Sequence, residues 1–172
     1  MLLPYSIKKN SAFTLVEVLI TVGIMILISG ALIPSFSSYI KNQNLVQAQE
    51  YVKSDLRSVQ NKALTGVGAS MATYSGYWGV KFVGGSSTYY YFITSTNPPT
   101  CPLVVPPLGT QGSGTIPAGV TPVATTCVFF SFAYGGFYAG SGAKPADIEI
   151  KLGTAASSKS VFINGAGLIY SN

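Results

Sequence analysis

The acidic and cysteine side chains are the residues whose chemistry this sequence lets us judge first. The chain has 172 residues, with five acids, two cysteines and no histidine. Without histidine, and with no second cysteine near either Cys101 or Cys127, a zinc site lacks ligands. The sequence also has no Gly-rich loop ending in Lys-Ser/Thr and no G-x-S-x-G elbow. We therefore expect no enzyme, no metal and no organic cofactor.

Asp147 and Glu149 are the acidic pair with the most suggestive spacing. They lie two residues apart in a segment that predicts a strand, so both side chains fall on one face. Such a pair could serve as two catalytic carboxylates or bind calcium weakly. Because charged residues are mostly exposed, we favour the simpler interpretation that this is the solvated face of the strand.

Cys101 and Cys127 both lie in the C-terminal half of the chain. In an exported chain an even number of cysteines favours a disulfide, and two buried free thiols are the alternative. A bridge would close a loop of 25 intervening residues. In the chain-entropy description a loop of this length stabilises the fold by roughly 3 kcal/mol.

Glu17 is the most unusual acid, because it lies inside an apolar segment. Between Phe13 and Ile40 the only other ionisable side chain is that of Tyr39. Residues 13–33 hold 21 positions dominated by Leu, Ile, Val, Met and Ala. As a helix they would extend roughly 30 Å, enough to cross a bilayer core. A carboxylate in hydrocarbon is costly and is usually paired and functional.

Three interpretations of this segment compete. A secretory signal would be cleaved after its apolar stretch, yet this stretch continues into Pro34 and an amphipathic segment. A plain single-span anchor fits the hydropathy but gives Glu17 no role, unless its carboxylate simply reaches water at the interface. Lys8 and Lys9 before the segment favour a cytoplasmic N-terminus.

The third interpretation rests on the residues around position 12. The motif Ser11–Glu17 (SAFTLVE) resembles the cleavage and methylation motif of type IV prepilins and type II secretion pseudopilins. The resemblance implies that residues 1–12 are a leader, that prepilin peptidase cleaves between Ala12 and Phe13, and that Phe13 is then N-methylated. Ala12 stands where the family usually has Gly. Pro34 falls where the family commonly has a helix-kinking proline.

The same resemblance implies a role for Glu17 in assembly and registry. Cleavage would expose an α-amine at Phe13, which is cationic near neutral pH. In an assembling filament the Glu17 carboxylate of one subunit would pair with the amine of its neighbour, which makes assembly register-selective. The implied partners are copies of the chain or related pilins, the prepilin peptidase/methyltransferase, an inner-membrane assembly platform and, before assembly, membrane lipid.

The charge distribution argues against nucleic acid as a partner. The net charge of +5 falls to +3 once Lys8 and Lys9 leave with the leader. The remaining basic residues are scattered along the chain, without a block or stripe. Nucleic-acid binding requires clustered positive charge, so no nucleic-acid partner is expected.

Behind the apolar segment the pattern predicts an amphipathic helix and then β-strands. The apolar stripe of the helix consists of Leu45, Val52, Leu56, Val59 and Ala63. Gly66 and Gly68 are expected to end this helix. The expected strands cover residues 77–83, 88–94, 127–134, 147–152, 160–163 and 168–170, with turns at 84–87 and 164–167.

We therefore expect an α+β pilin fold. In it a long N-terminal α-helix, membrane-spanning in its first half and amphipathic in its second half, packs on a C-terminal antiparallel β-sheet. The expected division is a leader at 1–12, a transmembrane and assembly half of the helix at 13–35, and a pilin head at 36–172. Residues 95–126 carry seven prolines and four glycines, which predicts a long irregular loop.

Aromatic residues are frequent in the expected strands. They could form a carbohydrate- or surface-binding patch, although alternating positions on strands favour core and cross-strand packing for most of them. The residues concerned are Tyr89, Tyr90, Tyr91, Phe92, Phe129, Phe130, Phe132, Tyr134, Phe137 and Tyr138.

The function implied by the resemblance is structural. The chain would be a subunit of a type IV pilus-like or type II secretion pseudopilus filament. It would be a single-pass membrane protein with an extracytoplasmic head, and then part of a filament at the cell surface or in the periplasm. The rival is a membrane-anchored adhesive or ligand-binding head that does not polymerise, for which Glu17 would be dispensable. A membrane-tethered hydrolase has the least support.

Overall fold

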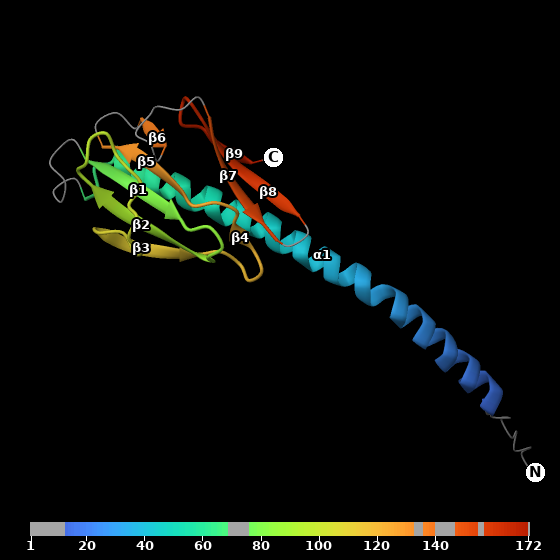
Figure 1. Ribbon diagram of the computed structural model, residues 1–172. Coiled ribbons are helices and arrows are strands. Elements are labelled where there is room, and N and C mark those ends of the chain that lie inside the picture. The colour runs from blue at the N-terminus through green and yellow to red at the C-terminus, as the bar shows by residue number, and fades with distance from the viewer. Residues whose placement is uncertain (1–12, 69–75, 133–135, 140–146, 155–156, 172) are drawn as a thin grey trace, which may run out of the picture. The chain divides into compact units, whose positions relative to one another are not determined.

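The chain forms two compact units, Met1–Tyr39 and Ile40–Asn172, and one helix belongs to both. The computed structural model describes residues 13–68, 76–132, 136–139, 147–154 and 157–171, except for the side chains of residues 31–35 and 139. Figure 1 labels the elements, which are α1 (Leu15–Leu64), β1 (Tyr77–Phe82), β2 (Thr88–Thr94), β3 (Thr110–Thr115), β4 (Thr121–Pro122), β5 (Thr126–Ser131), β6 (Phe137–Ala139), β7 (Asp147–Gly153), β8 (Ser158–Asn164) and β9 (Ile169–Ser171).

Both ends of α1 follow from local sequence. At the start, the Thr14 hydroxyl oxygen accepts a hydrogen bond of 3.2 Å from the Glu17 backbone N–H, so Thr14 acts as the N-cap. At the end, Gly66 adopts a positive φ of 69° and donates to the Ala63 carbonyl, and Val67 donates to the Lys62 carbonyl. These two bonds form a Schellman motif, as the glycines at this position predict.

The predicted apolar stripe of the helix is confirmed. All five of its residues are buried, from Leu45 to Ala63, and Ala48 joins them. They pack against side chains of both β-sheets in one hydrophobic core. Because the stripe repeats at spacings of three, four and seven residues, only one side of the helix contributes to this core.

The strands form two antiparallel sheets. The five-stranded sheet has the order β3-β2-β1-β5-β6, and the four-stranded sheet has the order β4-β7-β8-β9. In the centre of the five-stranded sheet, Trp78 of β1 lies opposite Ile93 of β2 and Phe130 of β5. In the four-stranded sheet β7 and β8 pair over seven residues, and the Asn164 turn leads into β9.

The five-stranded sheet is covered on both faces. Every residue of β1 is buried, although side chains along a strand alternate between two faces. Trp78 and Val80 belong to the core that contains the helix stripe. On the other face Tyr77, Phe92 and Phe129 form a second apolar cluster, against which Cys101 packs. The chain before β3 therefore covers the outer face of this sheet.

The predicted fold class is wrong. It required a long helix with a membrane-spanning first half, packed on one sheet. Among the described side chains of α1, only residues from Leu45 onward belong to the hydrophobic core, and the described helix contains no membrane span. The strands form two sheets instead of one. The apolar stripe of α1 packs against both sheets, and the spacing of its residues along the sequence does not reveal this.

The predicted membrane span is part of the same correction. No helix in the described part of the chain is long and apolar enough to cross a membrane. The predicted single-pass membrane localisation is not supported by these residues.

Most predicted strands are present, but the expected loop at 95–126 is only partly irregular. It contains β3, a Thr- and Gly-rich edge strand, and the two-residue β4. β6 was also not predicted. Strand propensity is low in TQGSGT, so β3 exists because β2 offers a paired partner over five positions.

Candidate functional site

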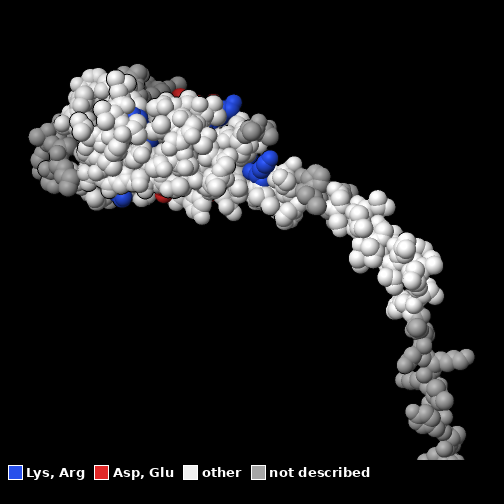
Figure 2. Space-filling model, turned by 60° about the horizontal axis from the view of Figure 1, so that its bottom comes forward, with Lys and Arg blue, Asp and Glu red and all other residues white. Residues whose placement is uncertain are grey.

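The described residues around position 13 expose apolar side chains on every side. Phe13, Leu15 and Leu27 are 78%, 80% and 76% exposed. Figure 2 shows this N-terminal helical segment as uncharged surface on the face in view. Phe13, Leu15, Val18, Leu19 and Val22 also line a shallow apolar hollow. Exposed apolar surface of this extent marks an interaction site.

Glu17 lies in the first turn of α1, and its side chain is exposed. Thr14-x-x-Glu17 matches a capping box, in which the acid at the third helical position also favours the positive end of the helix. The Thr14 half of this box is formed, and the spacing gives the Glu17 side chain a candidate local role beside the registry role that the motif implies. Ala12 and the side chain of Pro34 lie outside the described part of the chain. Their predicted roles in cleavage and in helix kinking therefore stay predictions.

The predicted disulfide is present. Cys101 and Cys127 are bonded, with their Cα atoms 5.5 Å apart. Cys127 lies in β5 directly opposite Lys81 of β1, so both side chains leave the same face of the five-stranded sheet. That face is the one covered by the second apolar cluster.

Lys81 holds the same loop by its charged end. Its side chain is only 2% exposed, and its Nζ donates to the carbonyls of Pro102 at 2.5 Å and Val104 at 3.0 Å. Burial lowers the pKa of Lys81. The disulfide and the Lys81 ammonium are adjacent tethers, so residues 101–104 are fixed to the sheet at two neighbouring points.

The tethered loop presents apolar side chains to solvent. Leu103 and Leu108 are 97% and 83% exposed, and Val104 is 60% exposed. Next to them, a hollow of about 220 Å³ is lined by Phe92, Thr94, Thr96, Thr100, Pro102, Val104 and Leu108. A rigid loop with exposed leucines has the character of a recognition surface, because little conformational entropy is lost on binding.

Asp55 joins the helix to the five-stranded sheet. The hydroxyl groups of Tyr89 and Tyr91 both donate to its Oδ2 atom, the latter at 2.6 Å. Burial, followed by the hydrogen bond to Asp55, raises the pKa of both tyrosines above the ordinary value. The carboxylate is thereby satisfied, so this cluster is structural rather than a free catalytic acid.

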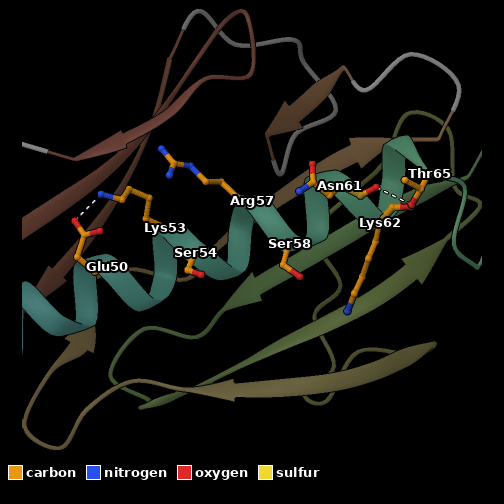
Figure 3. A pocket seen from close by; sticks show the side chains of 8 residues that line it. All are labelled: Glu50, Lys53, Ser54, Arg57, Ser58, Asn61, Lys62 and Thr65. Atoms are coloured by element: carbon orange, nitrogen blue, oxygen red, sulfur yellow. Dashed lines mark hydrogen bonds and ion pairs between the residues drawn. The ribbon is translucent and has the colours of Figure 1, made fainter.

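A polar groove of about 680 Å³ runs along α1 on the side opposite the core. At 100° per residue its lining positions share one face, and the buried stripe occupies the other. Figure 3 shows all eight side chains on this stretch of helix, between strands of the two sheets. They are Glu50, Lys53, Ser54, Arg57, Ser58, Asn61, Lys62 and Thr65.

The charges in the groove are unevenly distributed. At one end Glu50 and Lys53 form an ion pair of 2.5 Å, which lowers the pKa of Glu50. In the middle, Arg57 donates to the Ile169 carbonyl at 2.9 Å. At the other end the Lys62 ammonium lies 5.4 Å from the Trp78 ring centroid. The groove therefore runs from a neutral end to a cationic end.

Lys53, Arg57 and Gln60 also close the edge of the four-stranded sheet. They donate to the Ser171 hydroxyl, the Ile169 carbonyl and the Gly167 carbonyl of β9 and its turn. A free strand edge would leave these backbone groups open to another chain. Their spacing of four and three residues lets one helix face serve the whole edge.

Asp147 and Glu149 lie on the exposed face of β7, as the simpler interpretation predicts. Glu149 accepts a hydrogen bond from the Ser160 hydroxyl at 2.5 Å. Among the described residues, no group of three potential metal ligands comes together. Most of the aromatic side chains in the strands are buried or half-buried, which agrees with core packing; Tyr134 lies outside the described residues.

The sequence interpretation missed Lys81 and the groove. A lysine in the run YWGVKF, between a tryptophan and a phenylalanine, was a readable signal of a buried charge with a partner. The groove had a signal as well, since Ser54, Ser58, Asn61 and Thr65 repeat at helical spacing opposite the apolar stripe.

No family model matches the chain, and neither a curated protein nor a solved structure matches it.

Proposed function

We propose that this chain is a structural subunit of a type IV pilus-like or type II secretion pseudopilus filament. In this proposal prepilin peptidase cleaves before Phe13, and the mature chain assembles through its N-terminal helix. The motif Ser11–Glu17 supplies the family resemblance. The proposed partners are copies of the chain or related pilins, and the peptidase and assembly platform of the filament machine.

The observation that carries the proposal is the exposed apolar surface of residues 13–28. Leu19, Met25 and Ile26 are 68%, 69% and 67% exposed, in addition to the three residues named above. Full burial of one such side chain stabilises an assembly by about 1.5–3 kcal/mol. Packing of these helices against one another in a filament would remove this surface from water.

The second unit, residues 40–172, supports the proposal because it is a separately folded head. Residues 40–172 form a compact α+β unit whose described surface carries the loop at 101–108 and the polar groove. A filament subunit requires such a folded head next to its assembly helix. The rival function is a head that is displayed but does not polymerise. It requires the same folded head, but its N-terminal helix would not pack against helices of other copies.

The first experiment is the intact mass and N-terminal sequence of the chain from sheared surface material and from the cell fraction. A chain that begins at N-methylated Phe13 in sheared filaments is the expected result. A chain that still begins at Met1 in cells with active prepilin peptidase would contradict the proposed cleavage before Phe13. A processed chain that never enters sheared material would favour the non-polymerising head.

Replacement of Glu17 tests the registry role. We expect Glu17→Ala to lower the amount of chain in sheared filaments at least tenfold, because the carboxylate that would pair with a neighbour's amine is lost. Glu17→Gln is the matched control for the capping box, in which Gln can replace Glu. The registry role requires that Glu17→Gln lowers the amount of chain in sheared filaments as much as Glu17→Ala does.

Quantitative blotting of sheared and cellular fractions measures both variants. Thr14→Ala gives the complementary control, since it removes the hydroxyl that caps α1 and keeps the Glu17 charge. If Glu17→Gln assembles normally and Thr14→Ala does not, Glu17 acts through helix capping and the registry role is wrong.

A further inference from the structure

Two surfaces of the head carry charges in a matching order. Along the groove of α1 the order is Glu50, Lys53, Arg57 and Lys62, with the acid at one end and an excess of positive charge at the other. Along the exposed face of β7, Asp147 and Glu149 precede Lys151, so the acids lie at one end and the base at the other.

The two charged surfaces are also of comparable length. From Glu50 to Lys62 the helix rises about 18 Å, at ~1.5 Å per residue. From Asp147 to Lys151 the strand extends about 13 Å, at ~3.3 Å per residue. A strand face laid along the groove in the opposite charge order would bring its two acids to the Arg57–Lys62 end. The long side chain of Lys151 would then extend toward the Glu50 end.

The acids of β7 have no cationic partner among the described residues, although Glu149 accepts a hydrogen bond from the Ser160 hydroxyl. Within the described part of the chain, neither Asp147 nor Glu149 takes part in an ion pair, whereas Glu50 is paired with Lys53. Asp55 accepts hydrogen bonds from two tyrosines. In the groove, the Lys62 ammonium lies over the rings of Trp78 and Tyr91, without an acid beside it among the described residues.

One molecule cannot bring the two surfaces together. Ile148, Ile150 and Leu152 alternate with the charged residues of β7 and point into the core shared with the helix stripe. The charged face of β7 is therefore directed away from α1, whereas the groove is open on the side of α1 opposite that core. The two charged faces can meet only between different copies.

We infer that the acidic face of β7 in one copy docks into the groove of α1 in a second copy. The short side chains of Ser54 and Ser58 leave room on the groove floor for an approaching strand face. Because two different surfaces meet, the contact is head-to-tail and repeats from copy to copy. This inference rests on the proposed function as a filament subunit and specifies how neighbouring heads contact one another.

A charge swap in the full chain tests the contact. Lys62 is the groove residue to reverse, because Lys53 and Arg57 also hold β9. We expect Lys62→Glu to lower the yield of sheared filaments at least tenfold, and the pair Asp147→Lys with Glu149→Lys to do the same. The triple variant, which restores opposite charges, should return to within about threefold of the unmodified chain.

Controls separate the contact from folding and from the proposed function. Lys41→Glu reverses an exposed lysine of α1 outside the groove and should leave the yield unchanged. Equal thermal midpoints of the variants show that the head is folded. If Lys62→Glu lowers the thermal midpoint, Lys62→Gln takes its place, with a smaller expected loss of filament yield.

If the unmodified chain forms filaments and charge reversal has no effect on their yield, or the triple variant is no better than the others, this contact is wrong. If the unmodified chain forms no filaments, the proposed function is wrong.

Discussion

Asp55 shows how a single acid on the helix is used in the fold. In sequence it is one of several charged residues next to the apolar stripe. In the structure it accepts hydrogen bonds from Tyr89 and Tyr91, whose rings also meet edge to face at 5.7 Å. The Asp55 carboxylate, hydrogen-bonded to buried Tyr89 and half-buried Tyr91, ties α1 to β2. Spacing along the chain cannot predict this connection.

The tyrosine pair predicts a loss of stability at alkaline pH. Burial raises the pKa of both hydroxyls in the folded state, and an unfolded tyrosine ionises near pH 10. A raised folded pKa means that the stabilisation is fully present below about pH 10 and is lost as the pH rises beyond it. Urea unfolding midpoints at pH 8 and pH 11 measure this loss.

Tyr91→Phe removes one of the two titrating groups, and we expect it to reduce the alkaline loss. Tyr51→Phe is the matched control, because Tyr51 is 57% exposed. An equal alkaline loss in Tyr91→Phe, Tyr51→Phe and the unmodified chain would show that the tyrosine pair does not set the pH dependence.

At the scale of elements, the segment 95–108 is a cover for the five-stranded sheet. Its tethers, Cys101 and the carbonyls of Pro102 and Val104, attach to neighbouring residues of β5 and β1. The sequence predicted an irregular loop and, from the even cysteine count, the disulfide. The second tether depends on the strand register that places Lys81 opposite Cys127, so only the structure reveals it.

Removal of the Lys81 ammonium should loosen this cover. We expect Lys81→Met to lower the free energy of unfolding by about 1–3 kcal/mol, because buried hydrogen bonds from a charged donor are lost. Lys151→Met, at an exposed position on β7, should stay within about 0.5 kcal/mol. Urea unfolding measures both variants, and limited proteolysis within 95–108 reports opening of the cover. Equal stability of the two variants would mean that the disulfide alone holds the loop.

At the scale of the whole molecule, the division into Met1–Tyr39 and Ile40–Asn172 predicts that the head is an independent folding unit. Among the described residues, the hydrophobic core lies within positions 45–169 and includes none before Leu45. We therefore expect a fragment Ile40–Asn172 to unfold cooperatively, with a thermal midpoint within a few degrees of that of the full chain. Circular dichroism and calorimetry check this. A fragment without a cooperative transition would show that the first unit is needed for the fold.

Local sequence determined the parts of this protein that depend on neighbours along the chain. The apolar stripe at helical spacing, the glycines after Leu64 and the turn at Asn164 each predict their own structure, because helix caps and turns satisfy nearby backbone groups. The motif Ser11–Glu17 likewise supplies the proposed function without any contact in space. Short-range hydrogen bonds and periodicity suffice for these features.

Tertiary structure alone decided the features that join distant segments. The division of the strands into two sheets, β3 within a polar Gly-rich run, and the position of Lys81 beneath residues 102–104 all depend on long-range pairing. Strand propensity is weak in polar, Gly-rich runs, so such a segment forms a strand only where it pairs with a neighbouring strand. The sequence predicted the acidic face of β7, whereas the polar groove of α1 was recognised only in the structure. Their placement on different sides of one core, and hence their possible contact between copies, required the folded arrangement.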